Sequence, residues 1–255
     1  MTHLPLTKKS QTFIENLRIY LFSCGKKTRE IDEITDELSV HLYEAEKENK
    51  SVEHIIGSSP KEYMEQISGE MSFDVRGWAK YVPIIILGAF AGIVLKDIVF
   101  GGFQYSLVEL IGYPLVCIIL LLAYMWTFRL ISSHNFSKGK EFFFLYLASF
   151  ISIALFTGLM FLPNYIESPI ILLGYYGNLV VASLAISLLI GISIWSKTFV
   201  SIVLPIFYIV PEYLVSFTDL SEGNQLLASS ILMFAGIGIY LLFSLKRTKE
   251  VKSVH

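Results

Sequence analysis

Six long runs of apolar residues dominate residues 81–255 of this 255-residue chain. A helix needs roughly 20 apolar residues to cross the hydrocarbon core of a bilayer, and each run is close to that length. The hydrophobicity is continuous along each run and does not alternate. It therefore predicts helices, which satisfy their own backbone hydrogen bonds inside lipid. The predicted spans are 81–100, 107–128, 142–162, 170–195, 199–217 and 226–245.

Charged residues divide the chain into two parts. Residues 1–80 carry 14 of the 22 acidic and 11 of the 20 basic residues, while the longer remainder carries 8 and 9. Over the whole chain only 16% of residues are charged, against about 25% in an ordinary soluble domain. We predict an all-α protein with a helical domain at 1–75, a six-helix transmembrane bundle at 76–248 and a short basic tail at 249–255.

Basic residues alternate between the connections of the predicted spans. They precede the first span and follow the second, fourth and sixth: Arg76, Lys80, Arg129, Lys138, Lys140, Lys197, Lys246, Arg247, Lys249 and Lys252. The other connections contain a single basic residue, Lys96. Because Lys and Arg favour the cytoplasmic side, the pattern predicts a multi-pass protein of the cell membrane with both termini in the cytoplasm.

The N-terminal part, here called the head, reads as a set of short amphipathic helices. Apolar residues recur at helical spacing from Phe13 to Cys24 and again from Ile31 to Ala45. We expect Gly25 to end the first helix and Gly57 to end a short third one. Ser59, followed by Pro60 and by Glu62, predicts the start of a fourth, with a capping hydroxyl and proline at the first helical position.

The stretch DELSVHLYEA, which begins at Asp36, places Glu37, His41 and Glu44 on one helical face. Zinc sites usually need three or four converging ligands. The weaker interpretation is therefore a metal site, and the stronger one is a packed histidine flanked by solvated carboxylates. We predict no metal and no cofactor, and we treat the face made by these three residues as a candidate surface for a protein partner.

Three short patterns in the head carry a family resemblance. They are ELxxHLxEA from Glu37, KSxE from Lys50 and IGxxPKEY from Ile56. Over about residues 10–70 the chain resembles the HAAS-type signalling domain of Firmicutes. The resemblance implies a small helical cytoplasmic module fused to several membrane helices. It also implies a link to PadR-type repressors or other regulatory systems, and it supplies no catalytic residue.

Polar residues inside apolar spans are costly and are therefore candidates for function. Five of them fall in one predicted outer layer: Lys96, Asp97, Glu109, Asn178 and Glu212. In one interpretation they form an outward-facing pocket for a cation or small ligand, with Glu212 and Glu109 as its acids. In the other, Lys96, Asp97 and Glu109 mark the lipid interface and Glu212 is hydrogen-bonded within the bundle.

No phosphate-binding glycine loop, HExxH motif or G-x-S-x-G elbow is found in the sequence, so we expect no enzyme. The head is net acidic, which argues against direct binding of nucleic acid. We expect the lipid bilayer and a cytoplasmic regulatory protein as partners. Small-residue faces on the spans predict close helix packing within the bundle, with a homo-oligomer as the alternative. The first hypothesis is a regulatory or scaffolding membrane protein, and the second is a small transporter or permease component.

Overall fold

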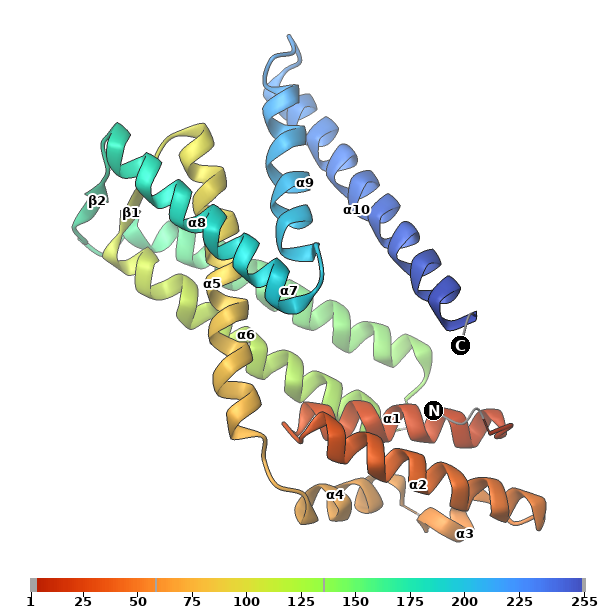
Figure 1. Cartoon of the computed structure of the whole chain (residues 1–255). Coiled ribbons are helices and arrows are strands. Elements are labelled where there is room, and N and C mark those ends of the chain that lie inside the picture. Colours follow the sequence, from red (N-terminus) through yellow and green to blue (C-terminus); the bar gives the residue numbers. More distant parts are fainter. Residues whose placement is uncertain (1–3, 58, 135, 254–255) are drawn as a thin grey trace. The chain divides into compact units, whose positions relative to one another are not determined.

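The computed structural model describes residues 4–57, 59–134 and 136–253. Ten α-helices make up most of this part of the chain, as the sequence predicts (Figure 1). The chain divides into two units. One comprises Met1–Pro83 with Ile111–Ile166, and the other comprises Ile84–Leu110 with Glu167–His255.

Four helices form the head: α1 (Lys8–Ser23), α2 (Thr28–Lys47), α3 (Val52–Ile56) and α4 (Pro60–Glu70). Their boundaries confirm the predicted starts and stops. Gly25 and Gly57 have φ of 72° and 75°, in the region that favours glycine at helix ends. The Ser59 hydroxyl accepts a hydrogen bond of 3.3 Å from the Glu62 amide at the start of α4. Local sequence chemistry therefore fixes the ends of α1 and α3 and the start of α4.

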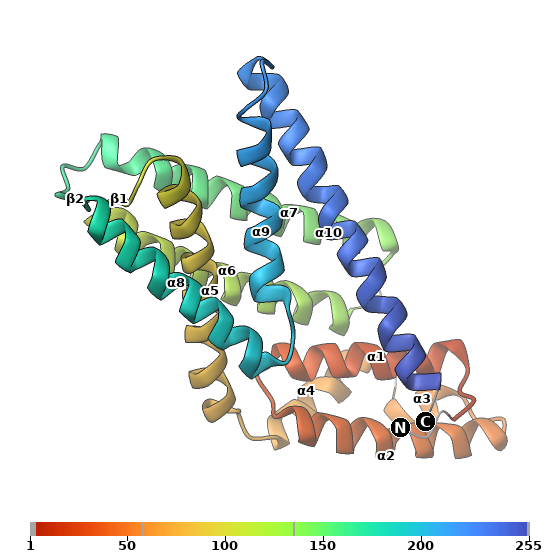
Figure 2. The same ribbon diagram turned by 45° about the horizontal axis from the view of Figure 1, so that its top comes forward.

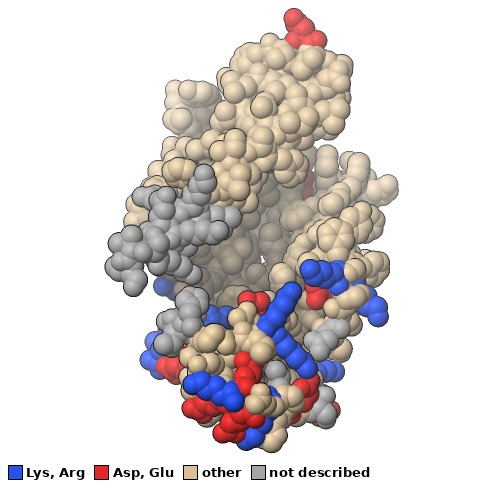
Figure 3. Space-filling view, turned by 90° about the vertical axis from the view of Figure 1, so that its right-hand side faces the viewer, with Lys and Arg blue, Asp and Glu red and all other residues tan. Residues whose placement is uncertain are grey.

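The head has its own hydrophobic core. Its buried members come from all four helices: Phe13, Leu17, Tyr20, Leu21, Ile31, Leu38, Leu42, Ile56 and Met64. Leu17, Leu21 and Leu42 have no solvent exposure. Burial of a leucine side chain contributes about 1.5–3 kcal/mol, so this cluster is a main source of the head's stability. Figure 3 shows the charged residues gathered on the head.

Glu46, near the end of α2, fixes the start of α1. The Thr7 amide donates to Glu46 Oε2 at 3.0 Å, and the Ser10 hydroxyl donates to Oε1 at 2.6 Å. Thr7 is the N-cap residue of α1, and Ser10 is fully buried. Burial by itself would raise the pKa of Glu46, but the hydrogen bonds from Ser10 and Thr7 outweigh it and hold the pKa below its usual 4.5.

Six apolar helices follow the head: α5 (Val75–Phe100), α6 (Leu107–Ser133), α7 (Lys138–Phe161), α8 (Tyr175–Ser196), α9 (Val200–Val215) and α10 (Glu222–Ser253). Five of them are long and apolar enough to cross a membrane, whereas α9 has only 16 residues. The predicted count of six full-length spans is therefore one too high by this criterion. Polar residues bound α9 on both sides, since Lys197 ends α8 with a φ of 54° and Thr218 follows α9.

The first unit joins the head to α6 and α7, which lie side by side (Figures 1 and 2). The hydroxyls of Tyr124 and Ser152 are hydrogen-bonded across this pair at 3.2 Å. Gly112 allows a close approach, because a Cβ at this position would collide with the Leu159 side chain. A short 3-10 helix, η1 (Leu162–Asn164), ends α7.

The second unit contains a small sheet that the sequence did not predict. Strand β1 (Gln104–Ser106) pairs antiparallel with β2 (Ile170–Leu172), and Tyr105 lies opposite Ile171. Strands of three residues are too short to show a period of two. As a result, the predicted span 170–195 begins later, at Tyr175.

Helices α9 and α10 form an antiparallel pair in the second unit, visible in both ribbon views (Figures 1 and 2). Gly236 of α10 lies against the ring of Phe207 in α9, with no room for a Cβ atom. Helix α10 continues to Ser253, so the predicted basic tail is helical up to that residue, and residues 254–255 lie outside the described part.

Replacement of Gly236 by Ala should destabilise the α9–α10 pair by about 1–3 kcal/mol, the usual cost of overpacking. Gly238, on the same helix, has open space at its Cβ position. The matched variant Gly238→Ala should be neutral or up to about 1 kcal/mol more stable, because alanine favours helix. Unfolding of the purified protein in mixed micelles, followed by circular dichroism, compares the two. Equal effects would contradict the close packing.

Loss of the Glu46 carboxylate should loosen the start of α1. Because the pKa of Glu46 is lowered in the folded state, its stabilising effect is present above the usual pKa and is lost as pH falls through the folded value. Glu46→Gln should therefore cost about 1 kcal/mol at neutral pH and much less in acid. Hydrogen exchange of the first amides of α1 in the full chain measures this difference. A pH-independent difference would refute the role of the charge.

Candidate functional site

Lys96 and Glu212 are the two predicted site residues that the structure brings together. Lys96 Nζ of α5 lies 2.8 Å from Glu212 Oε2 of α9, and 3.3 Å from the hydroxyl of Tyr208. The side chains are 22% and 37% exposed. An ion pair within apolar helices compensates two charges that would each be costly alone. It ties α5 to α9, the shortest of the apolar helices.

Asp97 and Glu109 have partners at the small sheet instead. The Tyr105 hydroxyl donates to the Asp97 carboxylate, and Tyr105 is buried in β1. Glu109 accepts hydrogen bonds of 2.8 Å from both the amide and the hydroxyl of Ser106. Glu109 also lies in the first turn of α6, where a carboxylate interacts favourably with the helix dipole.

Asn178 joins the loop before β1 to the start of α8. Its Oδ1 accepts from the Phe103 amide at 2.8 Å, and its Nδ2 donates to the Leu173 carbonyl at 3.2 Å. Gly102, beside it, has a φ of 90° and leaves little room for a Cβ next to the Asn178 amide. Asn178 therefore organises backbone at the ends of two helices.

The five predicted residues thus divide into an ion pair and a set of contacts around the sheet. Among the described residues, no group of three His, Cys, Asp or Glu side chains is arranged to hold a metal ion. Each of the five polar side chains has a protein partner. The outward-facing ligand pocket therefore remains a prediction that the structure does not test.

On the head, Glu37, His41 and Glu44 are all exposed on α2. His41 Nε2 lies 3.8 Å from Glu37 Oε1, and the two side chains are 56% and 76% exposed. The expectation of a packed histidine is wrong, because Leu38 and Leu42 alone carry that part of the helix into the core. The three residues form a solvated face of α2, and Val40 is 43% exposed beside them.

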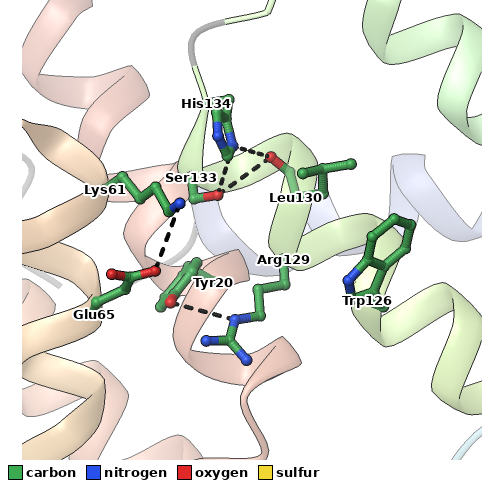
Figure 4. Close-up of a pocket in the computed structure, with 8 residues that line it drawn as sticks. All are labelled: Tyr20, Lys61, Glu65, Trp126, Arg129, Leu130, Ser133 and His134. Atoms are coloured by element: carbon green, nitrogen blue, oxygen red, sulfur yellow. Dashed lines mark hydrogen bonds and ion pairs between the residues drawn. The ribbon is translucent and has the colours of Figure 1, made fainter.

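Sequence reasoning missed a cavity of about 170 Å³ where the head meets the end of α6 (Figure 4). Both sides belong to the first unit. Helices α1 and α4 contribute three of the lining residues, and the end of α6 with the residue after it contributes five. The lining residues are Tyr20, Lys61, Glu65, Trp126, Arg129, Leu130, Ser133 and His134.

A contact between Tyr20 and Arg129 closes one side of this cavity. Arg129 Nε donates to the Tyr20 hydroxyl at 3.3 Å, and the guanidinium carbon lies 5.4 Å from the centre of the ring. Tyr20 is 1% exposed. Burial raises the pKa of Tyr20 although the hydrogen bond from Arg129 acts in the opposite direction, so the phenol stays neutral. The helical spacing of Tyr20 with Phe13 and Leu17 was the one signal that could have placed it in the core.

A helical head followed by several long apolar helices defines a multi-pass α-helical membrane protein. Residues 90–207 match the family model of the HAAS transmembrane region. This match supports a HAAS-type membrane protein. It covers α6, α7 and α8 with parts of α5 and α9, and it does not include residues 10–70, where the sequence patterns resemble the HAAS-type signalling domain. Comparison with curated proteins and with solved structures gives no match.

The Lys96–Glu212 pair should behave as a coupled unit. Lys96→Met and Glu212→Gln should each destabilise the protein by about 1–2 kcal/mol, a value reduced for partial exposure. The double variant should lose less unfolding free energy than the sum of the two single losses, because neither charge is then left without its partner. Unfolding in mixed micelles measures the cycle, with the exposed loop residue Asp219 changed to Asn as control. Additive losses would exclude the pairing.

Proposed function

We propose that this chain is a regulatory or scaffolding membrane protein, without enzymatic activity, whose head binds a protein partner in the cytoplasm. The observation that supports it most is that α2 has one face buried in the head core and another face exposed to solvent. The core residues of α2 are Ile31, Leu38 and Leu42. The exposed face with Glu37 and His41 contributes no side chain to this core and can face a partner.

The chemistry of this face favours a partner with a basic surface. Two carboxylates, Glu37 and Glu44, flank His41 and the exposed apolar side chain of Val40. Opposite charges around a small apolar centre steer association and fix the register of a complex. A regulatory protein with a basic, partly apolar groove or helix would match.

The proposed cytoplasmic position of the head follows from the distribution of basic residues together with a crossing by α9. The 16 residues of α9 span about 24 Å at 1.5 Å per residue, against a hydrocarbon thickness of about 30 Å. A short span of this kind is accommodated by local thinning of the bilayer. If α9 crosses, six crossings place both termini on the side richer in Lys and Arg.

A small transporter is the second candidate, and the Lys96–Glu212 pair is the observation that favours it. Ionisable residues inside spans often mark ion or substrate pathways. We place it second because both residues are satisfied by each other at 2.8 Å. A transported cation would have to compete with Lys96 for the Glu212 carboxylate.

A photo-crosslinking amino acid at Val40 should capture a specific cytoplasmic protein in cells that express the full chain. The same group at Glu62, which is exposed on α4, is the matched control and should give no such product. The double change Glu37→Lys and Glu44→Lys should abolish the crosslink, because it reverses the charge of the face while leaving the head core intact. Persistence of the product in that variant, or an identical product from Glu62, would reject the proposed face.

A further inference from the structure

The cavity between the head and the end of α6 combines an excess of positive charge with a position at the end of a membrane helix. Lys61 and Arg129 are its cations, Glu65 is its carboxylate, and His134 adds a titratable ring (Figure 4). Lys61 Nζ lies 3.9 Å from Glu65 Oε1, and both side chains are about half exposed, at 49% and 47%. This is a loose pair, and Lys61 can turn towards an anion in the cavity.

Arg129 has donors available on the cavity side. Its Nε is bonded to Tyr20, and its two terminal nitrogens have no hydrogen-bond partner among the described residues. Tyr20 thereby holds the guanidinium plane in one orientation. The planar fork of arginine matches the oxygens of a phosphate group. The cavity of about 170 Å³ has room for several waters of about 30 Å³ each, and therefore for such a group.

His134 and Ser133 line the other side. His134 Nδ1 lies 2.9 Å from the Ser133 hydroxyl and 3.1 Å from the Leu130 carbonyl. The carbonyl can only accept, so Nδ1 donates to it. The other ring nitrogen, Nε2, has no partner among the described residues.

The surface of α6 below the cavity is apolar and exposed. Moving along the helix away from Arg129, residues of the same face follow at intervals of three or four: Trp126, Leu122, Ile119 and Leu115. They are 63%, 58%, 44% and 53% exposed. Tryptophan at such a position is typical of the membrane–water boundary. An apolar track therefore leads from the cationic cavity along the membrane-spanning part of α6.

We propose that this cavity binds the phosphate headgroup of an anionic phospholipid, whose acyl chains lie along the exposed face of α6. The phosphate contacts the terminal nitrogens of Arg129, with Lys61 as a second cation. Because Lys61 belongs to the head and Arg129 to α6, one bound lipid links the two. The apolar track distinguishes a lipid from a soluble phosphate, which would make no use of it.

The test uses the fluorescence of Trp126 in the full chain, reconstituted in vesicles of phosphatidylcholine and phosphatidylglycerol. Trp78→Phe and Trp195→Phe leave Trp126 as the only tryptophan. Bromination of either lipid in turn then reports which one lies beside it. We expect phosphatidylglycerol to quench Trp126 more than phosphatidylcholine at the same bulk fraction. Equal quenching by the two lipids would overturn the proposal.

Arg129→Gln should reduce the preference for phosphatidylglycerol about fivefold, the effect of one cationic contact near a membrane surface. Lys61→Gln, on an exposed part of α4, should reduce it in the same direction and keeps the test valid if Arg129→Gln fails to fold. Lys138 carries the same charge at the start of α7 but does not line the cavity. Lys138→Gln should leave the preference unchanged, and an equal loss there would show diffuse attraction only.

Competition with inorganic phosphate distinguishes a lipid headgroup from a soluble phosphate as the ligand of the cavity. If the lipid occupies the cavity, added phosphate should lower the preference for phosphatidylglycerol beside Trp126 no more than sodium chloride of the same ionic strength does. If phosphate at constant ionic strength removes the preference, the site binds a soluble phosphate and the assignment to lipid is wrong.

Discussion

The absence of hydrogen-bond partners in hydrocarbon is the constraint on which the rest of this structure depends. It requires every backbone group of residues within the membrane to be satisfied locally, and helices do this. In the described part of the chain the sheet has strands of only three residues, and polar side chains gather around it. Asp97, Glu109 and Asn178 all bond to groups in or beside β1 or β2. Two of these predicted site residues, Glu109 and Asn178, thus bond to backbone groups where helices begin, and Asp97 bonds to the Tyr105 side chain.

The apolar helices and the head are stabilised by different forces. The head is surrounded by water, and burial of leucine side chains in its own core stabilises it through the hydrophobic effect. The apolar helices gain nothing comparable from contact with each other, since lipid is equally apolar, and they associate through close packing and polar pairs. Gly112 against Leu159, Gly236 against Phe207, and Lys96 with Glu212 are contacts of that kind. Loss of one such contact therefore affects helix association, whereas loss of a core leucine affects the fold of the head.

Sequence periodicity predicted the elements well and the contacts between them poorly. The glycine and serine signals near residues 25, 57 and 59 marked the ends of α1 and α3 and the start of α4, because capping is local chemistry. The sequence gives no such signal for a three-residue strand, so residue 170 was assigned to a span. The pairing of Tyr20 with Arg129 joins residues 109 positions apart. No local sequence pattern around either residue predicts this contact, which forms only when the chain folds.

The junction between head and α6 is where the two halves of the proposed role meet. A partner bound on the exposed face of α2 and a lipid bound beside Arg129 would contact helices that share one small core, since Tyr20 and Leu42 both belong to it. A ligand shifts a conformational equilibrium only through differential affinity for its states. The lipid contacts both the head and α6, so it binds most tightly when the head is docked. The composition of the bilayer would then set how the face with Glu37 and His41 is presented to its partner.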